Sequence, residues 1–525
     1  MPRTSPPGID TAGLARAMRA FASEIGREWV QVAEENLVPY RDAYGFAQPV
    51  AHEPAGAVSP ANVEQLRAVL RLANEHKVPL WPISRGKNFG YGGAAPAMSG
   101  TVVLDLGRMR GILDVDVARG VVVVEPGVGF FDLYDFLERE KIPLWASMPG
   151  NSLGSVLGNA LEYGLGYGPM GDRANSLVGM EVMLPSGELV RTGMGAMEGS
   201  PCWNLFPYSY GPSWDRLFMQ SSFGIVTKAG VWLYPEPEEV LSLDLEVPNE
   251  ADIGWIVEAL APLRMRGVVQ GPVNIGNFMR IVMGSGRRSE WAADSHAIPD
   301  SRHKEIMEEF GLGWWGLHLT FYGEPELNRA RAKVVTDAFA RHTAQRFEMH
   351  SWKRGEPRPP APSHGVPISF PLRIANWLSP NGGHLGFSPV LPPDRTAIEQ
   401  QISRSRAMFR KHDFDFYGGV TLGERHVNVV NMLAYDRDDA GMTKRADALF
   451  RELMADAEVR GFGEYRSHLS YMDDVRETYG FNGGALHRLN EWMKDAIDPN
   501  GILAPGKQGI WPRHLRDVGF RGGRT

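Results

Sequence analysis

The loop between Pro82 and Pro96, PISRGKNFGYGGAAP, has residues of the types that bind an anion. Five of the nine residues at positions 86–94 are small: Gly86, Gly90, Gly92, Gly93 and Ala94. Because glycine has no Cβ, consecutive backbone N–H groups of such a loop can turn inward around a phosphate or pyrophosphate. Arg85 and Lys87 add positive charge, and Tyr91 adds a phenol. A glycine-rich surface turn is the alternative interpretation of this loop.

A second glycine-rich segment, MPGNSLGSVLGNALEYGLGYGPMGD (148–172), contains a formal G-x-G-x-x-G at Gly166, Gly168 and Gly171. In a Rossmann turn this pattern follows a strand and begins a helix, whose N-terminus meets the pyrophosphate. Here Pro169 interrupts the pattern, and residues 178–184 after it are typical of a strand. We therefore reject a Rossmann site in this segment.

His384 stands among the glycines of PNGGHLGFSPV (380–390), which predict a loop. From the residues alone, it is either a hydrogen-bonded loop histidine or a functional one. The histidines of the chain show no H-E-x-x-H motif and no paired ligand spacing, so we expect no metal site.

The glycine-rich segments resemble flavin-binding segments of the vanillyl-alcohol oxidase and p-cresol methylhydroxylase family, most closely its eugenol oxidase-like 4-alkylphenol oxidases. SSFGIVTK (221–228) and DPNGILAPGKQGIWP (498–512) extend the resemblance, which runs from about residue 10 to 515. It implies that the cofactor is FAD. The contacts that it implies are Arg85, Gly86, Lys87, Asn88, Gly90, Gly92, Pro149, Gly154, Ser155, Gly158, Asn159, Gly224, Ile225 and Lys507.

The resemblance also implies roles for the chemistry-bearing residues. His384 falls at the histidine that bonds covalently to the 8α-methyl of FAD in the oxidase branch, where p-cresol methylhydroxylase has a tyrosine. Tyr91, Tyr465 and Arg466 match the family's phenolate clamp. A phenol has a pKa near ~10, and a fixed positive charge with hydrogen-bond donors at its oxygen ionises it at neutral pH. Ser388 is expected to line the same pocket.

The reaction that these residues imply is the oxidation of para-alkylphenols, such as guaiacyl-type phenols related to lignin. A hydride leaves the benzylic carbon for flavin N5, the substrate becomes a p-quinone methide, and O₂ is reduced to hydrogen peroxide.

One position departs from the family. Close relatives have an aspartate beside flavin N5, and the ungapped match of LWASMPGNSLGSVLGN puts Gly150 there. The neighbouring Asn151 is polar but is no general base near neutral pH, and both residues are expected in the substrate pocket. Alternatives therefore stay open: a lyase or desaturase acting on bulkier lignin-derived phenolic dimers, a cytochrome-coupled methylhydroxylase, or a flavin-binding protein without catalysis.

The pattern of elements predicts an α+β fold in two domains, the FAD-binding domain of this family and a substrate-covering cap. We assign residues 1–237 to the first part of the FAD-binding domain, 238–461 to the cap and 462–525 to the return. Predicted helices cover 11–40, 130–141, 251–265, 326–342, 396–411 and 443–459, and another begins at Pro60 with Ser59 as its N-cap. Predicted strands cover 78–83, 101–106, 121–124, 314–322, 414–422 and 427–433.

The composition and the net charge limit the classes of partner that the protein can bind. Apolar residues make up 43% of the chain, charged residues 22%, and the net charge is −7, so we expect no nucleic acid or anionic lipid partner. The single cysteine, Cys202, excludes an internal disulfide. No run of eighteen apolar residues and no N-terminal h-region occur, so we expect a soluble cytoplasmic protein. The resemblance suggests a homodimer, because only the short MEGSPCWN stands where the octameric relative has a long insertion.

Overall fold

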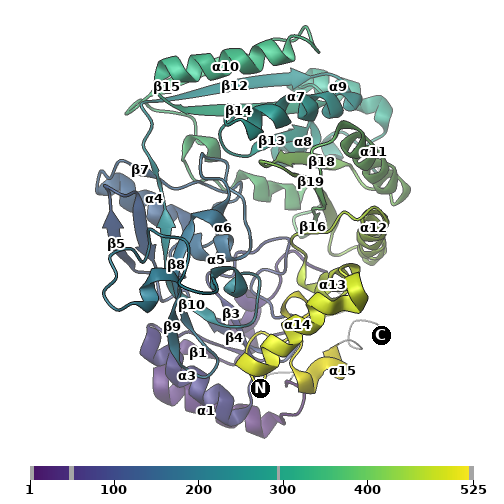
Figure 1. Ribbon diagram of the computed structural model, residues 1–525. Helices are drawn as coiled ribbons and strands as arrows, with labels where there is room; N and C mark the ends of the chain where they lie inside the picture. The colour runs from purple at the N-terminus through teal and green to yellow at the C-terminus, as the bar shows by residue number, and fades with distance from the viewer. Residues whose placement is uncertain (1–4, 47–51, 293–295, 520–525) are drawn as a thin grey trace.

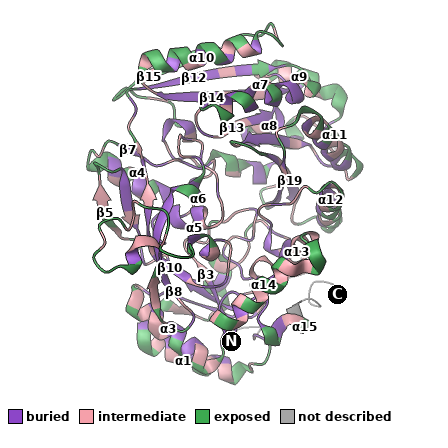
Figure 2. Ribbon diagram, viewed as in Figure 1, coloured by how far each residue is buried: buried purple, intermediate pink, exposed green. Residues whose placement is uncertain are grey.

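The computed structural model describes residues 5–46, 52–292 and 296–519. The chain forms an N-terminal half with two main sheets, a second half built on one large sheet, and a C-terminal segment that returns to the first half (Figure 1). The buried residues follow the strands of both halves, and the outer faces of the helices are exposed (Figure 2). The α+β fold expected from the sequence is confirmed. The boundaries at 237 and 461 remain predictions.

The N-terminal half contains a four-stranded and a five-stranded sheet. The first has the order β1 (Val30–Gln31), β2 (Gly56–Val58), β4 (Val102–Asp105) and β3 (Leu80–Ile83), and β2, β4 and β3 are parallel. The second is antiparallel, with the order β5 (Ile112–Asp116), β6 (Val121–Val124), β10 (Ile225–Trp232), β8 (Leu177–Met183) and β9 (Leu189–Arg191). β7 (Leu144–Trp145) pairs separately with β11 (Tyr234–Pro235).

The helices of this half are α1 (Thr11–Ile25), α2 (Glu34–Leu37), α3 (Val63–His76), α4 (Phe130–Arg139), α5 (Val156–Leu161) and α6 (Arg173–Ser176). Two predictions need correction here. The helix predicted over 11–40 ends at Ile25, because Gly26 has a φ of 96° that breaks the helical path, and β1 and α2 follow. The N-cap of α3 is Asn62, whose Oδ1 accepts from Gln65 N at 2.9 Å. Ser59 lies three residues before this N-cap and still belongs to the sheet, because its N–H donates to the Trp29 carbonyl at 3.0 Å and continues the pairing of β1 with β2.

The second half is built on an antiparallel sheet of eight strands. Its order is β15 (Glu348–Lys353), β12 (Glu239–Val247), β14 (Trp315–Gly323), β13 (Val273–Asn277), β18 (Tyr417–Leu422), β19 (Val427–Asp436) and β16 (Gly382–Phe387), and β17 (Val390–Leu391) also pairs with β19. Its helices are α7 (Ile253–Met265), α8 (Met279–Ser285), α9 (Asp300–Phe310), α10 (Pro325–Phe339), α11 (Arg395–Lys411) and α12 (Ala440–Val459).

Alternation along these strands separates a core face from a polar face. In β14 the side chains of Trp315, Leu317, Leu319 and Phe321 join one hydrophobic core with residues of α7, α10, α11 and α12. The residues between them, Gly316, His318, Thr320 and Tyr322, point to the opposite face. β12 alternates in the same way. The helices therefore cover one face of the large sheet and leave the other for the site.

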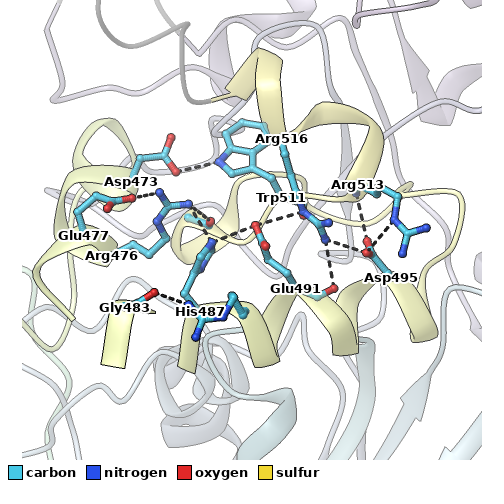
Figure 3. Close-up of polar contacts among 12 residues, drawn as sticks. Asp473, Arg476, Glu477, Gly483, His487, Glu491, Asp495, Trp511, Arg513 and Arg516 are labelled. Atoms are coloured by element: carbon cyan, nitrogen blue, oxygen red, sulfur yellow. Dashed lines mark hydrogen bonds and ion pairs between the residues drawn. The ribbon is translucent and has the colours of Figure 1, made fainter. Parts of the chain in front are cut away.

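The C-terminal segment contains α13 (Met472–Thr478), α14 (Phe481–Ile497) and α15 (Arg516–Gly519). Polar contacts hold its parts together (Figure 3). Trp511 Nε1 donates to Asp473 Oδ1 at 2.8 Å, and Arg516 Nη2 donates to Asp495 Oδ2 at 2.8 Å. This network fixes the chain on both sides of Lys507, which is thereby carried back to the N-terminal half.

Candidate active site

A narrow cleft of about 190 Å³ lies where β3, α5, the start of β10 and the C-terminal segment meet. Ten of the residues predicted to contact FAD line it: Gly86, Lys87, Asn88, Gly154, Ser155, Gly158, Asn159, Gly224, Ile225 and Lys507. Segments far apart in the sequence thus build one elongated site.

The cleft fits the pyrophosphate of a dinucleotide. Within the described residues, the backbone N–H groups of Gly86, Lys87 and Asn88, which line the cleft, have no hydrogen-bond acceptor. Gly86 and Gly90 have φ values of 63° and 80°, which turn the loop around the cleft. A Cβ at Gly154 would meet no atom within 4 Å, so this wall leaves the cleft open. Free donors in a glycine-rich loop are what a bound diphosphate requires.

Four predicted contacts lie elsewhere. The Arg85 guanidinium pairs with Asp132 of α4 and does not line the cleft. Gly90 packs against the His384 ring, and Gly92, with a φ of 110°, packs against Leu469. Pro149 lines a second cavity next to the cleft.

The second cavity has a volume of about 590 Å³ and lies between the glycine-rich loops and the polar face of the eight-stranded sheet. Lys87, Asn88, Tyr91, Asn159 and Arg466 line both the cleft and this cavity. The two spaces therefore meet at these residues. A cofactor in the cleft would present its reactive end to a ligand in the cavity.

The predicted clamp stands at this junction. Tyr91, Tyr465, Arg466 and Ser388 all line the cavity. The Cζ atom of Arg466 lies 4.3 Å from the centroid of the Tyr91 ring, and its Nη2 donates to Asn88 Oδ1. Its Nε is buried and has no hydrogen-bond partner in the described part of the chain. Arg466 thus keeps an N–H free for a ligand oxygen.

Backbone contacts fix the positions of these side chains. Val390 N donates to the Gly463 carbonyl at 2.9 Å, and Pro389 forms a bridge with Glu464, so Ser388 lies beside Tyr465. Gln220, which lines the cleft, donates from Nε2 to the Tyr465 carbonyl at 3.0 Å.

Burial sets the protonation of the clamp. It raises the pKa of the Tyr91 hydroxyl, against the opposing effect of Arg466, and it raises the pKa of Tyr465. Both hydroxyls therefore stay protonated and able to donate. Burial also raises the pKa of Glu464 well above its ordinary value, so its carboxyl group is neutral beside the clamp.

His384 lies in β16, so the loop predicted over 380–390 is wrong for this part. Its glycines are required by close packing: a Cβ at Gly383 would lie 2.5 Å from the Tyr44 carbonyl, and one at Gly386 3.3 Å from the Tyr91 hydroxyl. The His384 side chain is buried, which lowers its pKa to about 4. Its Nδ1 is buried without a partner among the described groups. The ring is thus neutral and nucleophilic, and it lies against the loop at Gly90.

Gly150 and Asn151 line the cavity as predicted from the sequence. A Cβ at Gly150 would meet only Tyr167 Cε2, at 3.4 Å. Asp244 is the single carboxylate among the described residues that line the cavity, and its Oδ1 is 2.7 Å from His318 Nδ1. No lining carboxylate therefore takes the place of the family's aspartate at Gly150.

Sequence reasoning missed Tyr167, Arg280, His318 and Tyr417, which also line the cavity. Tyr167 lies in the glycine-rich segment 148–172, so its place in the sequence could have predicted that it lines the cavity. The others depend on which strands are neighbours, because the alternation of β14 shows two faces without showing which one meets the flavin domain.

Comparisons with known proteins agree with this geometry. Residues 54–193 match the FAD binding domain family, and residues 370–508 match the C-terminal domain of FAD linked oxidases. The chain is 35% identical to the 4-cresol dehydrogenase [hydroxylating] flavoprotein subunit of Pseudomonas putida, over 96% of this chain and 97% of the relative. The chain belongs to the vanillyl-alcohol oxidase and p-cresol methylhydroxylase family. Its cofactor is therefore FAD.

Two further relatives bear on the chemistry of this family member. The structure of 4-ethylphenol oxidase from Gulosibacter chungangensis, an isoeugenol complex, matches with a TM-score of 0.94 and 33% identity, over 98% of this chain and all of that one. The 1'-carboxy-chondrochloren decarboxylase of Chondromyces crocatus is 28% identical over 96% of this chain and 99% of the relative. These similarities cover nearly the whole chain, so it shares the fold and the FAD-binding domains of these phenol-oxidising relatives.

In the described ranges, no helix is long and apolar enough to span a membrane. Nor do the described residues bring together three or more His, Cys, Asp or Glu side chains in a way that suits a metal ion.

Proposed function

We propose that this protein is an oxidase that removes a hydride from the benzylic carbon of para-alkylphenols of the guaiacyl type and passes the electrons to O₂. One observation carries the proposal: Tyr91 and Arg466 line both the cofactor cleft and the large cavity, with Tyr465 beside them. A phenol held by these residues has its para carbon in the cavity and its ring next to the cleft.

The clamp ionises the phenol. Arg466 supplies a fixed positive charge, and the protonated hydroxyls of Tyr91 and Tyr465 supply short hydrogen bonds to the phenolate oxygen. The negative charge of the oxygen moves through the ring toward the para carbon as the benzylic hydride departs. The substrate then becomes a p-quinone methide. FAD, when bound, supplies the hydride acceptor for this step.

His384 is proposed as the covalent attachment point of the flavin. Its neutral ring, its unpartnered Nδ1 and its contact with the loop at Gly90 support this role. After acid precipitation, the yellow colour should stay with the wild-type protein and be released from His384→Ala. His303→Ala, which removes a partly buried neutral histidine outside the cleft, is the matched control. Release of the flavin from wild type would contradict the proposal.

A second candidate is a lyase or desaturase that works through the same quinone methide. Gly150 favours it, because the cavity has no carboxylate there to activate water. A full-length relative is named a decarboxylase. In this alternative reaction the quinone methide loses a proton or a carbon fragment instead of adding water. A methylhydroxylase that passes its electrons to a cytochrome is distinguished by its inability to use O₂.

The test is to mix the purified protein with 4-propylguaiacol without oxygen, follow the flavin absorbance and then admit air. We expect bleaching, recovery in air and formation of hydrogen peroxide, with Arg466→Gln as the control that bleaches slowly. Recovery only after addition of a cytochrome would exclude the oxidase. If wild-type flavin stayed oxidised with alkylphenols of every size, the proposed function would be wrong. The homodimer and the cytoplasmic location remain predictions, and light scattering of the purified protein tests the first.

A further inference from the structure

The large cavity has a second guanidinium far from the clamp. Arg280, in the first turn of α8, lines the cavity. Its Nη1 donates to Asn274 Oδ1 at 3.1 Å, and it has no carboxylate at ion-pair distance in the described part of the chain. A cavity-facing arginine without a counter-ion is unusual, because burying an unpaired charge costs free energy.

The floor of the cavity shows why the side chain can lie there. On the polar face of the sheet, Gly276 of β13 pairs with Gly316 of β14 on one side and with Gly419 of β18 on the other. A Cβ at Gly276 would lie 2.8 Å from Arg280 Cδ, so the Arg280 side chain rests on this glycine. The row of glycines gives the guanidinium room above the strands.

A polar row runs beside the glycine row. Neighbouring strands pair Asp244 with His318, His318 with Asn274, Asn274 with Thr421, and Thr421 with Asn428. All five residues line the cavity, and Asn428 Oδ1 is buried without a partner among the described residues. The floor thus offers hydrogen-bonding groups along the whole width of the cavity.

The sheet also gives the distance between Arg280 and the clamp. Arg280 lies over β13, and the Tyr91 hydroxyl lies over Gly386 of β16. Passing from β13 through β18 and β19 to β16 crosses three strand spacings, which is roughly 14 Å. A phenol with a one- or two-carbon side chain, held at the clamp, cannot reach Arg280.

The surroundings of Arg280 favour an anion. Two phenols, Tyr167 and Tyr417, line the cavity in the range of its charge, and burial keeps both protonated by raising their pKa values. Glu246 lies within the electrostatic range of Arg280 but forms no ion pair with it: its Oε2 accepts from the Gly313 N–H at 2.8 Å, and its Oε1 lies 2.8 Å from where a Cβ on Gly316 would be. The protonated hydroxyls of Tyr167 and Tyr417 are thus hydrogen-bond donors within the range of the Arg280 charge.

We propose that the natural substrate is an elongated phenol whose para substituent ends in a carboxylate, and that Arg280 binds this carboxylate while the clamp holds the phenol oxygen. The proposal rests on the proposed function, because it names the substrate class of the same cavity. The carboxylate replaces the missing counter-ion of Arg280, and the length of the cavity selects for a side chain of several carbons.

The test uses ligands that cannot be oxidised, so that it does not depend on turnover. In 4-(4-hydroxyphenoxy)butanoate an ether oxygen replaces the benzylic carbon, and its methyl ester is the uncharged partner. Binding to the holoenzyme is followed by the change in flavin absorbance. We expect the acid to bind wild type at least 10-fold more tightly than the ester, and (4-hydroxyphenoxy)acetate, which is too short, to show no such preference over its own ester.

Arg280→Gln should abolish the preference for the long acid, and Arg280→Lys should retain part of it. Arg287→Gln, the same charge change at an exposed residue that does not line the cavity, should keep it in full. Equal binding of acid and ester by wild type, or a preference that survives Arg280→Gln, would overturn the inference. Reduction of the flavin by uncharged 4-alkylphenols is measured separately. It tests the proposed function, whereas the binding experiment tests only whether Arg280 binds the carboxylate.

Discussion

The guanidinium of Arg466 lies over the ring of Tyr91, with Cζ 4.3 Å from the ring centroid, at the point where the cofactor cleft opens into the large cavity. Tyr91 comes from the glycine-rich loop after β3, and Arg466 comes from the chain between α12 and α13. This stacking joins the cofactor cleft to the cavity in which we propose that the phenol binds. Under the proposed function, the position of the phenolate oxygen relative to the flavin depends on it.

Replacing Arg466 by glutamine should slow flavin reduction by a 4-alkylphenol about 10- to 100-fold at pH 7. The loss corresponds to one charge-assisted hydrogen bond, about 1.5–3 kcal/mol. The loss in rate should become smaller toward pH 10, where the phenol ionises without the positive charge of Arg466. Stopped-flow measurement of flavin bleaching from pH 6 to 10 checks this. An equal loss at every pH would mean that Arg466 does not act on the phenol's ionisation.

Much of this arrangement could be predicted from the sequence, because the information was local. The glycines around Lys87 and those between Gly154 and Asn159 indicate a backbone that approaches a ligand, and the structure places both segments along the cleft. The environment of Arg280 could not be predicted in this way, because it depends on the pairing of β13 with β14 and β18. Strand order is set by packing over the whole domain, and no local pattern reports it.

The errors in the predicted elements have the same origin. Ser59 followed by Pro60 is a good local start for a helix, but the Ser59 N–H donates to the carbonyl of Trp29, the residue before β1, so the chain is still paired with the sheet there. The glycines beside His384 favour a loop by composition. In the structure they are strand residues because β16 pairs with β19, and they are glycines because Tyr44 and Tyr91 leave little room for a Cβ.

Introducing aspartate at Gly150 should change the product. The φ of Gly150 lies outside the left-handed region, and its Cβ would meet only Tyr167, so the side chain fits. The added carboxylate can activate water, and we expect more benzylic alcohol and less alkene or cleaved product from 4-propylguaiacol. It also takes up room, so substrates with bulky para groups should react more slowly.

Gly150→Asn is the matched control for size without charge. Products are identified by mass spectrometry after reaction in ¹⁸O-labelled water. The same product distribution from wild type and both variants would show that this position does not determine the fate of the quinone methide.

Stability of the flavin-free protein should fall in mild acid. Burial lowers the pKa of His52, His303 and His384 to about 4 each. In the unfolded chain they take up protons near pH 6.5, so between pH 6.5 and about 4 the unfolded state binds more protons and stability falls as the pH falls. Each histidine contributes about 1.4 kcal/mol per pH unit in this window.

Thermal unfolding from pH 7.5 to 5 measures the effect. His52→Gln should flatten the pH dependence by about one third, because glutamine can still bond with the groups that His52 contacts, the Ala97 carbonyl and the Ser470 hydroxyl, without taking up a proton. A melting temperature that stays constant from pH 6.5 to 5 would refute the prediction.

Lys494 and Asp498 form a fully buried ion pair at the base of the cofactor cleft, with Nζ 2.8 Å from Oδ2. Lys494 Nζ also donates to the Ser222 carbonyl at 3.0 Å, and Asp498 accepts from the Ile502 and Leu503 N–H groups at 3.0 and 2.8 Å. Ser222 and Leu503 line the cleft. The pair thus ties α14 to the wall that holds the cofactor.

Lys494→Met should therefore destabilise the protein by about 3–5 kcal/mol, because it leaves the Asp498 carboxylate buried without its partner. It should also weaken FAD retention. In Lys494→Met/Asp498→Asn the remaining group is neutral and still accepts a backbone N–H, so the double variant should be more stable than Lys494→Met alone. The free energies of urea unfolding of wild type and of the Lys494→Met, Asp498→Asn and double variants form a double-mutant cycle. If the double variant lost the sum of the two single losses, the ion pair would contribute no coupling and the cleft wall would be held by the backbone bonds alone.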